Sequence, residues 1–259
     1  MTLFRQFFVA HIKGLLIWMA VGALMGFALT RSVGTFVDGG IFEAMPASML
    51  ALYGDFTGMN VVDIYLTISV GKGTVLIPTL YAVIMALSIV TREVDRRTVE
   101  FLLALPVQRM QVLLARLGVL AVNVTLVNAA IWAVLRFDIA AQGYEGSWAH
   151  LNVLFVNLWL LCMALAAVTL AASMWIDDYS VGVKLFLGLV TLTFFLEYVF
   201  RGAHLSRAIR LITPYSYADL AMVMRTGTID TLNAVVLLVA IVGGLAVSFW
   251  AFNRKQFSA

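Results

Sequence analysis

Residues 91–109 read TREVDRRTVEFLLALPVQR, and this stretch decides how the rest of the chain is arranged. Seven of its nineteen residues are charged, in a chain that is 63% hydrophobic. Long apolar runs precede and follow it. Because the interior of a membrane disfavours charged side chains, we expect the stretch to lie in water or against another protein. It therefore separates two predicted membrane spans.

The composition places the whole chain in the membrane. Charged residues make up 12% of its 259 residues, and the mean hydropathy is +0.99. A soluble domain carries about 25% charged residues. We therefore predict an all-α integral membrane protein in which residues 1–259 form a single transmembrane domain. The net charge of +3 comes with no basic run interleaved with aromatic residues, so no nucleic-acid partner is expected.

Six segments are long enough to be transmembrane helices. A span takes about 20 mostly apolar residues, because every backbone polar group must find its partner within the membrane. With the N-terminus inside, cytoplasmic segments hold ten of the 17 Lys and Arg residues and outer segments hold seven. This bias predicts cytoplasmic termini, in a bacterial-type inner or plasma membrane. The predicted spans are 14–30, 74–90, 112–135, 151–176, 181–200 and 232–252.

The segments outside the spans are predicted to contain short helices. Residues 1–13 repeat apolar side chains at helical spacing, with basic residues between them, as in a helix that lies in the membrane interface. The alternative is that they are the first turns of a longer first span. In the outer segment 31–73, Pro46 and Gly54 bound a predicted short helix at 44–53. The outer segment 201–230 favours a re-entrant pair of short helices over a free loop.

Motifs for enzyme chemistry are missing from the sequence. Gly71-Lys72 is the only Gly-Lys pair, and Leu66 stands where a Walker A loop needs its first glycine. The single Cys162 excludes an intrachain disulfide and a multi-cysteine metal site. We therefore expect a chain that is not itself an enzyme and holds no cofactor or metal.

Polar residues within the predicted spans have two interpretations. Glu197 and Arg201 can pair on one helix face at a spacing of four residues. They either line a translocation path or, as we favour, form an interfacial ion pair with a snorkelling arginine. Arg116 is also predicted to snorkel. Asn123 and Asn128 are predicted to hydrogen-bond to neighbouring helices.

Gly22 and Gly26 form a G-x-x-x-G pattern in the first span. Small residues at this spacing let two helices approach closely. The pair predicts either a subunit interface or packing within the chain.

The charged stretch itself has the pattern of a short amphipathic helix. At helical spacing Glu93, Arg97 and Glu100 share one side. Pro106 ends the helix and restricts Leu105 to extended backbone. The alternative is a solvated loop.

The order of residues in this stretch resembles the permease subunits of ABC-2 type transporters. Segments 45–54, 211–217 and 252–255 resemble further parts of that family. Arg97 stands where relatives often have glycine, and Gln108 where they often have a small hydroxyl residue. The matching positions are Glu93, Thr98, Glu100, Leu102, Leu103, Leu105, Pro106, Val107 and Arg109.

The resemblance implies an exporter permease with six spans, surrounded by membrane lipid. Two such subunits, a homodimer or two related chains, would pair with two copies of a separate ABC ATPase that binds ATP and Mg. Residues 91–109 would form the cytoplasmic coupling helix against that ATPase. The implied ATPase-coupling residues are Glu93, Arg97, Thr98, Glu100, Phe101, Leu102, Leu105, Pro106 and Arg109.

Three functions remain open at this point. The first is export of a hydrophobic or amphipathic drug, antibiotic, peptide or lipid. The second uses the same complex for the assembly or maturation of an extracytoplasmic metal or sulfur centre. The third is a carrier or membrane enzyme that works without an ATPase.

Overall fold

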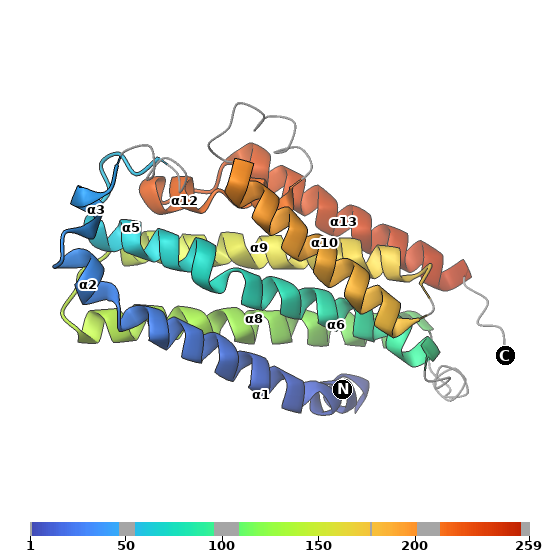
Figure 1. Ribbon diagram of the computed structural model, residues 1–259. Helices are drawn as coiled ribbons and strands as arrows, with labels where there is room; N and C mark the ends of the chain where they lie inside the picture. Colours follow the sequence, from blue (N-terminus) through green and yellow to red (C-terminus); the bar gives the residue numbers. More distant parts are fainter. Residues whose placement is uncertain (1, 47–54, 96–108, 177, 201–212, 255–259) are drawn as a thin grey trace.

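A computed structural model describes residues 2–46, 55–95, 109–176, 178–200 and 213–254. Helices make up nearly all of these ranges (Figure 1). Runs rich in Leu, Val, Ala and Met favour this outcome, because an α-helix satisfies its own backbone hydrogen bonds where no water is present.

Six helical segments within the described ranges are long and apolar enough to cross a membrane. The predicted all-α architecture with six spans is therefore confirmed. The helices that form the spans are α1 (Thr2–Thr30), α5 (Val61–Ile68) with α6 (Leu76–Asp95), α8 (Arg109–Ala141), α9 (Trp148–Ser173), α10 (Tyr179–Phe200) and α13 (Thr231–Arg254).

The second span begins earlier than predicted. We expected it to start at residue 74, whereas the apolar segment runs over Val61–Ile89. Residues 61–73 had been assigned to the outer segment 31–73. The structure buries Asp63, which is 4% exposed. Its carboxylate accepts hydrogen bonds from the backbone N–H (2.8 Å) and the hydroxyl (2.6 Å) of Ser147, so it satisfies the start of α9.

A π-helix, η1 (Ser69–Thr74), joins α5 to α6. Its wider turn is marked by a hydrogen bond from the Val75 N–H to the Val70 carbonyl, at 2.9 Å. Gly73 lies against α1 here, and a Cβ at this position would be 2.6 Å from Leu29. The glycine therefore permits close packing of η1 on α1.

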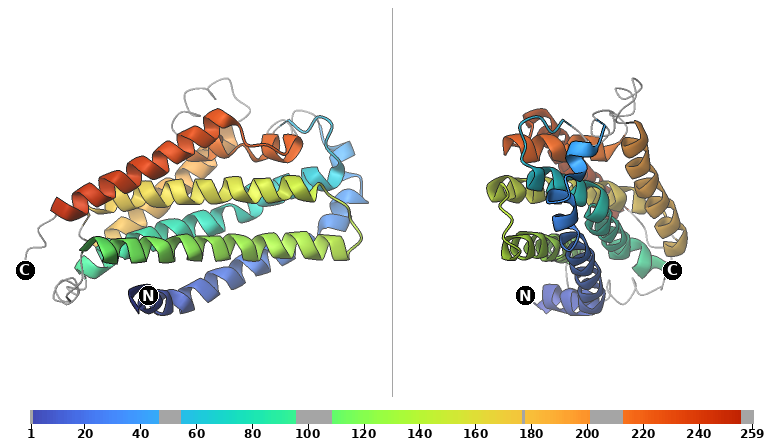
Figure 2. Two further views of the ribbon diagram at one scale, coloured as in Figure 1. Left: turned by 180° about the vertical axis from the view of Figure 1, so that it is seen from behind. Right: turned by 60° about the vertical axis from the view of Figure 1, so that its left-hand side comes forward.

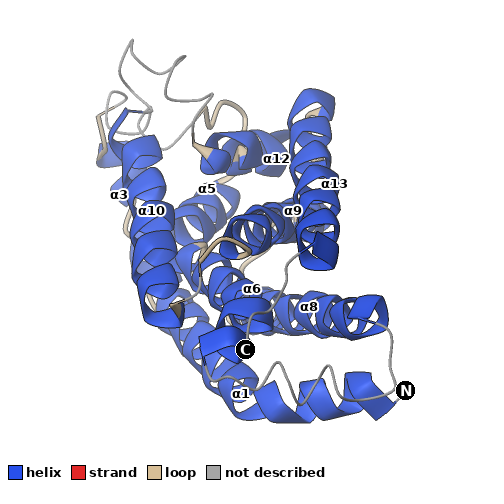
Figure 3. Ribbon diagram, turned by 90° about the vertical axis from the view of Figure 1, so that its right-hand side faces the viewer, coloured by secondary structure: helices blue, strands red, loops and turns tan. Residues whose placement is uncertain are grey.

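The helix α9 lies at the centre of the bundle, with α6, α8 and α13 packed around it (Figure 2; Figure 3). Fifteen of its 26 residues are buried. Alanines along α9 let α13 approach to backbone contact. A Cβ on Gly244 of α13 would lie 2.7 Å from the carbonyl group of Ala167. Small residues bring membrane helices together in this way.

Three helices at the periphery of the bundle have much of their apolar surface exposed. The most apolar stretch is 17% buried in α1, 22% in α10 and 22% in α13, against 67% in α9. Leu24, Leu192 and Val239 are among their exposed side chains. Faces of this kind suit lipid or another subunit.

The two ends of the bundle differ in structure. One end, which we call the proximal end, carries the start of α1, the end of α6 and the start of α8 (Figure 1). The end of α13 and the turn between α9 and α10 lie there as well. The opposite, distal end carries α2 (Val33–Val37), α3 (Ile41–Ala44) and α12 (Leu220–Thr226).

Polar contacts join neighbouring segments at the distal end. Arg31 and Asp138 form an ion pair at 2.9 Å, which links α1 to α8. Arg225 of α12 pairs with Asp55, which precedes α5. Hydrogen bonds from Thr57, together with Arg225, lower the pKa of the Asp55 carboxyl below its ordinary value.

The N-terminal segment is continuous with the first span. Helix α1 runs from Thr2 to Thr30 without an interruption at residue 13. Figure 3 shows its first turns crossing the proximal end at an angle to the rest of the helix. Phe4 and Phe8 stack in these turns, with ring centroids 6.2 Å apart. An interfacial position for this segment stays a prediction.

Two predicted features lie partly outside the described residues. Helix α3 ends at Ala44, where the short helix 44–53 was expected to begin, and 47–54 are not described. Of the outer segment 201–230, the described part begins at residue 213. It contains the 3-10 helix η2 (Pro214–Ala218) and α12. Re-entry of this segment into the membrane stays a prediction.

Candidate coupling site and its supports

The predicted coupling segment is attached to two helices of the bundle at the proximal end. Glu93 lies in the last turn of α6, and Arg109 is the first residue of α8. Both helices therefore end at the segment that was expected to bind an ATPase. The other predicted coupling residues, Arg97, Thr98, Glu100, Phe101, Leu102, Leu105 and Pro106, lie outside the described residues.

Arg116 connects three helices just inside this end. The sequence analysis predicted that its side chain extends to the membrane surface. The structure instead buries this side chain, and the residue is only 9% exposed. One guanidinium nitrogen donates to the backbone carbonyl of Ile89 in α6. The guanidinium carbon lies 4.4 Å from the centre of the Phe7 ring in α1. Arg116 therefore links α8 to both α6 and α1.

These contacts are strong enough to matter mechanically. A hydrogen bond to a charged group contributes about 1.5–3 kcal/mol. A desolvated cation–π contact contributes about 2 kcal/mol. Arg116 lies two turns after the start of α8, and Ile89 lies less than two turns before the end of α6. The two ends that flank residues 96–108 are thus tied to each other.

A second polar cluster lies nearer the distal end, at Glu197 of α10. Glu197 is 9% exposed and accepts a hydrogen bond of 3.0 Å from the hydroxyl of Thr213. Its predicted partner Arg201 lies outside the described residues. The structure therefore brings Glu197 together with the segment that precedes η2, and this partner was not predicted.

The helix η2 packs against α9, α10 and α13, and its Tyr215 side chain reaches α6. The Tyr215 side chain is 6% exposed, and its hydroxyl lies 3.1 Å from that of Thr79 in α6. The Tyr215 ring also meets Phe194 of α10 edge to face, at 5.5 Å between centroids. Asn157 of α9 donates a hydrogen bond of 2.8 Å to the Ala218 carbonyl. Sequence reasoning noticed the proline and aromatic residues of this segment but missed their docking.

The two glycines of the G-x-x-x-G pattern face α8 of the same chain. A Cβ on Gly22 would lie 2.8 Å from Ile131, and one on Gly26 would lie 3.5 Å from Val134. Both glycines are buried. Their close contact is therefore made within the chain, and this face of α1 is not free for a second subunit.

Of the two asparagines of α8, Asn128 makes one weak hydrogen bond to a neighbouring helix, as predicted, whereas Asn123 makes none in the described residues. Asn128 donates to the Val124 carbonyl of its own helix at 2.9 Å, and its amide nitrogen lies 4.0 Å from the Cys162 sulfur. Its Oδ1 atom and both polar atoms of Asn123 have no hydrogen-bond partner among the described residues. Buried polar groups without a partner are uncommon in folded proteins.

The fold and these contacts define a class of protein. In the described part of the chain, no group of three or more His, Cys, Asp or Glu residues could hold a metal ion. The buried polar side chains instead connect one helix to another. The molecule is a multi-pass membrane protein whose helix ends are linked by charged and polar contacts.

The chain belongs to the ABC-2 family of transporters. The family model described as ABC-2 family transporter protein matches residues 43–257, which confirms the resemblance seen in the sequence. No curated protein matches the chain. The protein is therefore a membrane permease of an ABC transporter, and its family implies partnership with an ABC ATPase.

Proposed function

We propose that two copies of this chain form the membrane part of an ATP-driven exporter. It moves a hydrophobic or amphipathic compound out of the cytoplasm, and two separate ATPase subunits hydrolyse the ATP. The family supports the pairing with an ATPase. The uncovered apolar faces of α1, α10 and α13 provide surfaces for a second copy and for lipid.

Residues 91–109 carry the coupling in this proposal, and the contacts of Arg116 are the observation that supports it. Because Arg116 joins α6 to α8 and α1, a displacement of the intervening segment moves three helices together. ATP binding on the partner can then bias a two-state arrangement of the bundle. If the segment were loosely attached, the same displacement would not move the helices.

The composition of the complex is the first test. The tagged full-length chain is purified in mild detergent, and the ATPase activity and subunit ratio of the product are measured. We expect an ATPase in equal numbers with two copies of the chain. A chain that carries no ATPase, under conditions that keep other ABC transporters intact, would contradict the proposal and favour an ATPase-independent carrier.

Charge reversal tests the coupling segment itself. Glu100→Lys is expected to abolish most of the transport-linked ATPase stimulation, because it places a cation where the segment is expected to bind the ATPase. Glu145→Lys is the matched control, since Glu145 is exposed at the distal end. Normal stimulation in Glu100→Lys, with the complex intact, would count against the assignment.

The direction of transport is tested in inside-out membrane vesicles. Export from the cytoplasm predicts ATP-dependent accumulation of a fluorescent amphipathic dye inside such vesicles. Accumulation only in right-side-out vesicles would show import.

A further inference from the structure

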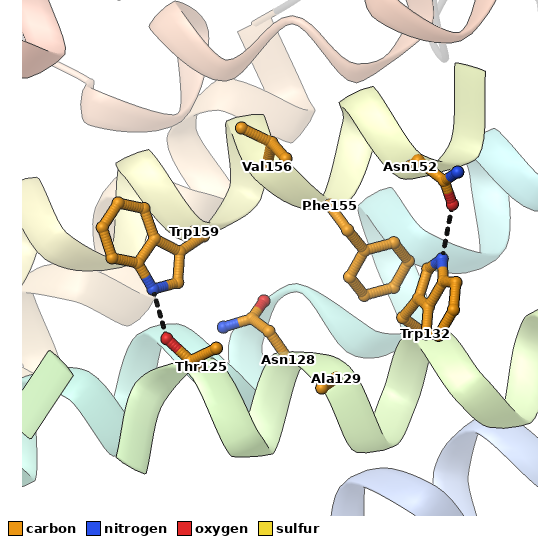
Figure 4. Close-up of a pocket in the computed structure, with 8 residues that line it drawn as sticks. All are labelled: Thr125, Asn128, Ala129, Trp132, Asn152, Phe155, Val156 and Trp159. Atoms are coloured by element: carbon orange, nitrogen blue, oxygen red, sulfur yellow. Dashed lines mark hydrogen bonds between the residues drawn. The ribbon is translucent and has the colours of Figure 1, made fainter. Parts of the chain in front are cut away.

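A slot of about 430 Å³ opens between α8 and α9 on the outside of the bundle (Figure 4). Each helix contributes four residues, spaced so that they share one face. The slot lies toward the end of the bundle that carries the α8–α9 connection, and its lining is almost entirely apolar. Its volume falls in the range of small-molecule sites, which is about 300–1,000 Å³.

Two tryptophans bound the slot. The indole nitrogen of Trp132 in α8 donates to Asn152 of α9, and that of Trp159 in α9 donates to Thr125 of α8, each at 2.9 Å. Figure 4 shows both bonds crossing between the helices. Both indole N–H groups therefore already have an acceptor, and the rings contribute apolar surface to the slot. Seven residues along α8 separate Thr125 from Trp132, a distance of about 10 Å along a helix axis.

One buried polar atom of a residue that lines the slot remains without a partner. Asn128 lines the slot between the two tryptophans and is 4% exposed. Its amide nitrogen donates to the Val124 carbonyl, which fixes the orientation of the amide because that carbonyl can only accept. The Asn128 Oδ1 atom is buried and has no hydrogen-bond partner in the described ranges. An unmade bond at this depth is costly, because the membrane supplies no water.

We propose that the slot binds a neutral small molecule dissolved in the membrane, with a compact apolar body and one hydroxyl or amide N–H that donates to Asn128 Oδ1. The apolar lining excludes a charged head group. A transmembrane helix of another protein would need a groove nearer 30 Å long, whereas the indoles close this one after about 10 Å. This site is separate from the proposed transport function.

Photolabelling of the full-length chain tests the site. The protein is purified in mild detergent with any subunit that binds it, and is exposed to octanol that carries a diazirine group. The octane analogue with the same diazirine lacks the donor and serves as the matched probe. Labelled peptides are located by mass spectrometry. We expect saturable labelling of the slot by the alcohol, displaced by excess octanol, and about 5- to 10-fold weaker labelling by the alkane.

Two variants make the result specific. Asn128→Leu removes the acceptor at similar size and is expected to bring alcohol labelling down to the alkane level. Ala129→Leu fills the slot from an exposed position and is expected to abolish labelling by both probes. Ala246→Leu, at an exposed position of α13 outside the slot, is the matched control and should label like the wild type.

The proposal is overturned by any of four results. Equal slot labelling by alcohol and alkane, or undiminished labelling in Asn128→Leu, would show that Asn128 recognises no donor. Unsaturable labelling spread over the exposed faces of α1 and α13 would indicate annular lipid. A second protein crosslinked through the slot would identify a helix as its occupant. Because labelling requires no ATP, each outcome is independent of the transport proposal.

Discussion

At the scale of single residues, the contacts of Arg116 distinguish this bundle from a set of apolar helices. A buried guanidinium is tolerated only when its charge is compensated by acceptors and aromatic rings. Ile89 provides a backbone carbonyl and Phe7 provides an aromatic face. The resulting link lies within two turns of the segment that we propose to meet the ATPase.

Arg116→Met should destabilise the protein by about 2–4 kcal/mol, because it removes both contacts at nearly constant length. Cys162, the single buried cysteine, reports unfolding when it becomes accessible to a maleimide dye. Arg116→Lys is the control. Its stability should fall between those of the wild type and Arg116→Met, since lysine keeps the charge but loses the planar group. Unchanged thermal stability in Arg116→Met would show that the link is dispensable.

The pair of Asp55 and Arg225 should make the distal end sensitive to acid. The pKa of Asp55 is lowered in the folded state by Thr57 and then by Arg225, so its contribution to stability is present above the unfolded pKa. It is lost as the pH falls through the folded value. Asp55→Asn should therefore flatten the decline in unfolding temperature between about pH 5 and pH 2. Parallel curves for the two proteins, followed by tryptophan fluorescence, would refute this.

Sequence reasoning was weakest for these residues. It located Arg116 near a span end and expected it to extend into the interface, as isolated arginines do. The true direction depends on Phe7, which comes from a distant part of the chain. The pairing of Glu197 with Arg201 stays a prediction, because Arg201 lies outside the described residues, and the bond from Thr213 to Glu197 was not foreseen. Local patterns do not encode contacts of this kind.

At the scale of elements, close helix approach is set by single glycines. Gly244 faces the backbone of Ala167, whereas a Cβ on the adjacent Gly243 would meet nothing within 4 Å. The two positions can be compared directly, because they are adjacent in the same helix and lie at the same depth in the membrane.

Gly244→Ala is expected to lower stability by about 1–3 kcal/mol, since it forces α13 away from α9. Gly243→Ala should be neutral or raise stability by about 0.5–1 kcal/mol, because alanine favours the helix. Thermal unfolding in detergent distinguishes them. Equal effects of the two substitutions would mean that α13 shifts freely on α9.

The docking of η2 depends on the hydroxyl pair of Tyr215 and Thr79. The Thr79 hydroxyl also lies 2.9 Å from the Val75 carbonyl, to which it can donate, so it is free to accept from Tyr215. A double-mutant cycle with Tyr215→Phe and Thr79→Val should give a coupling of about 0.5–1.5 kcal/mol. Additive effects would show that the hydroxyl groups do not interact.

The elements themselves were largely predictable. Hydropathy found six spans, because the membrane requirement for length and apolarity is stringent. It missed the first half of the second span, where Asp63 lies inside a helix and satisfies the start of α9. A polar residue with a long-range structural partner cannot be distinguished from a loop residue by composition.

At the scale of the whole molecule, the arrangement of the ends predicts a sidedness. Glu145 lies between α8 and α9 at the distal end, and Asp178 lies before α10 at the proximal end. Single cysteines at these positions, in a Cys162→Ala background, should react with an impermeant maleimide from opposite sides of the membrane. We expect Asp178→Cys to react from the cytoplasm. Labelling of both from one side would contradict the six-span topology.

The family and the overall architecture could be inferred from the motif in residues 93–109 and from the spans. The position of the candidate coupling site stays a prediction, since most of its residues lie outside the described ranges. The slot between α8 and α9 had no signal of its own in the sequence. Its tryptophans and asparagines become a site only when two antiparallel helices align them.

The π-helix η1 also affects where the chain can tolerate the insertion or deletion of a residue. A π-helical turn contains one residue more than an α-helical turn. The side chains of α5 and α6 therefore point in the directions they would have in a regular helix that is one residue shorter. Deletion of one residue at Gly71–Gly73 can be absorbed by closing η1 into an ordinary turn. The same deletion within α9 would rotate every later side chain by about 100°. Insertions and deletions among relatives should therefore accumulate at η1 and be rare in the central helix.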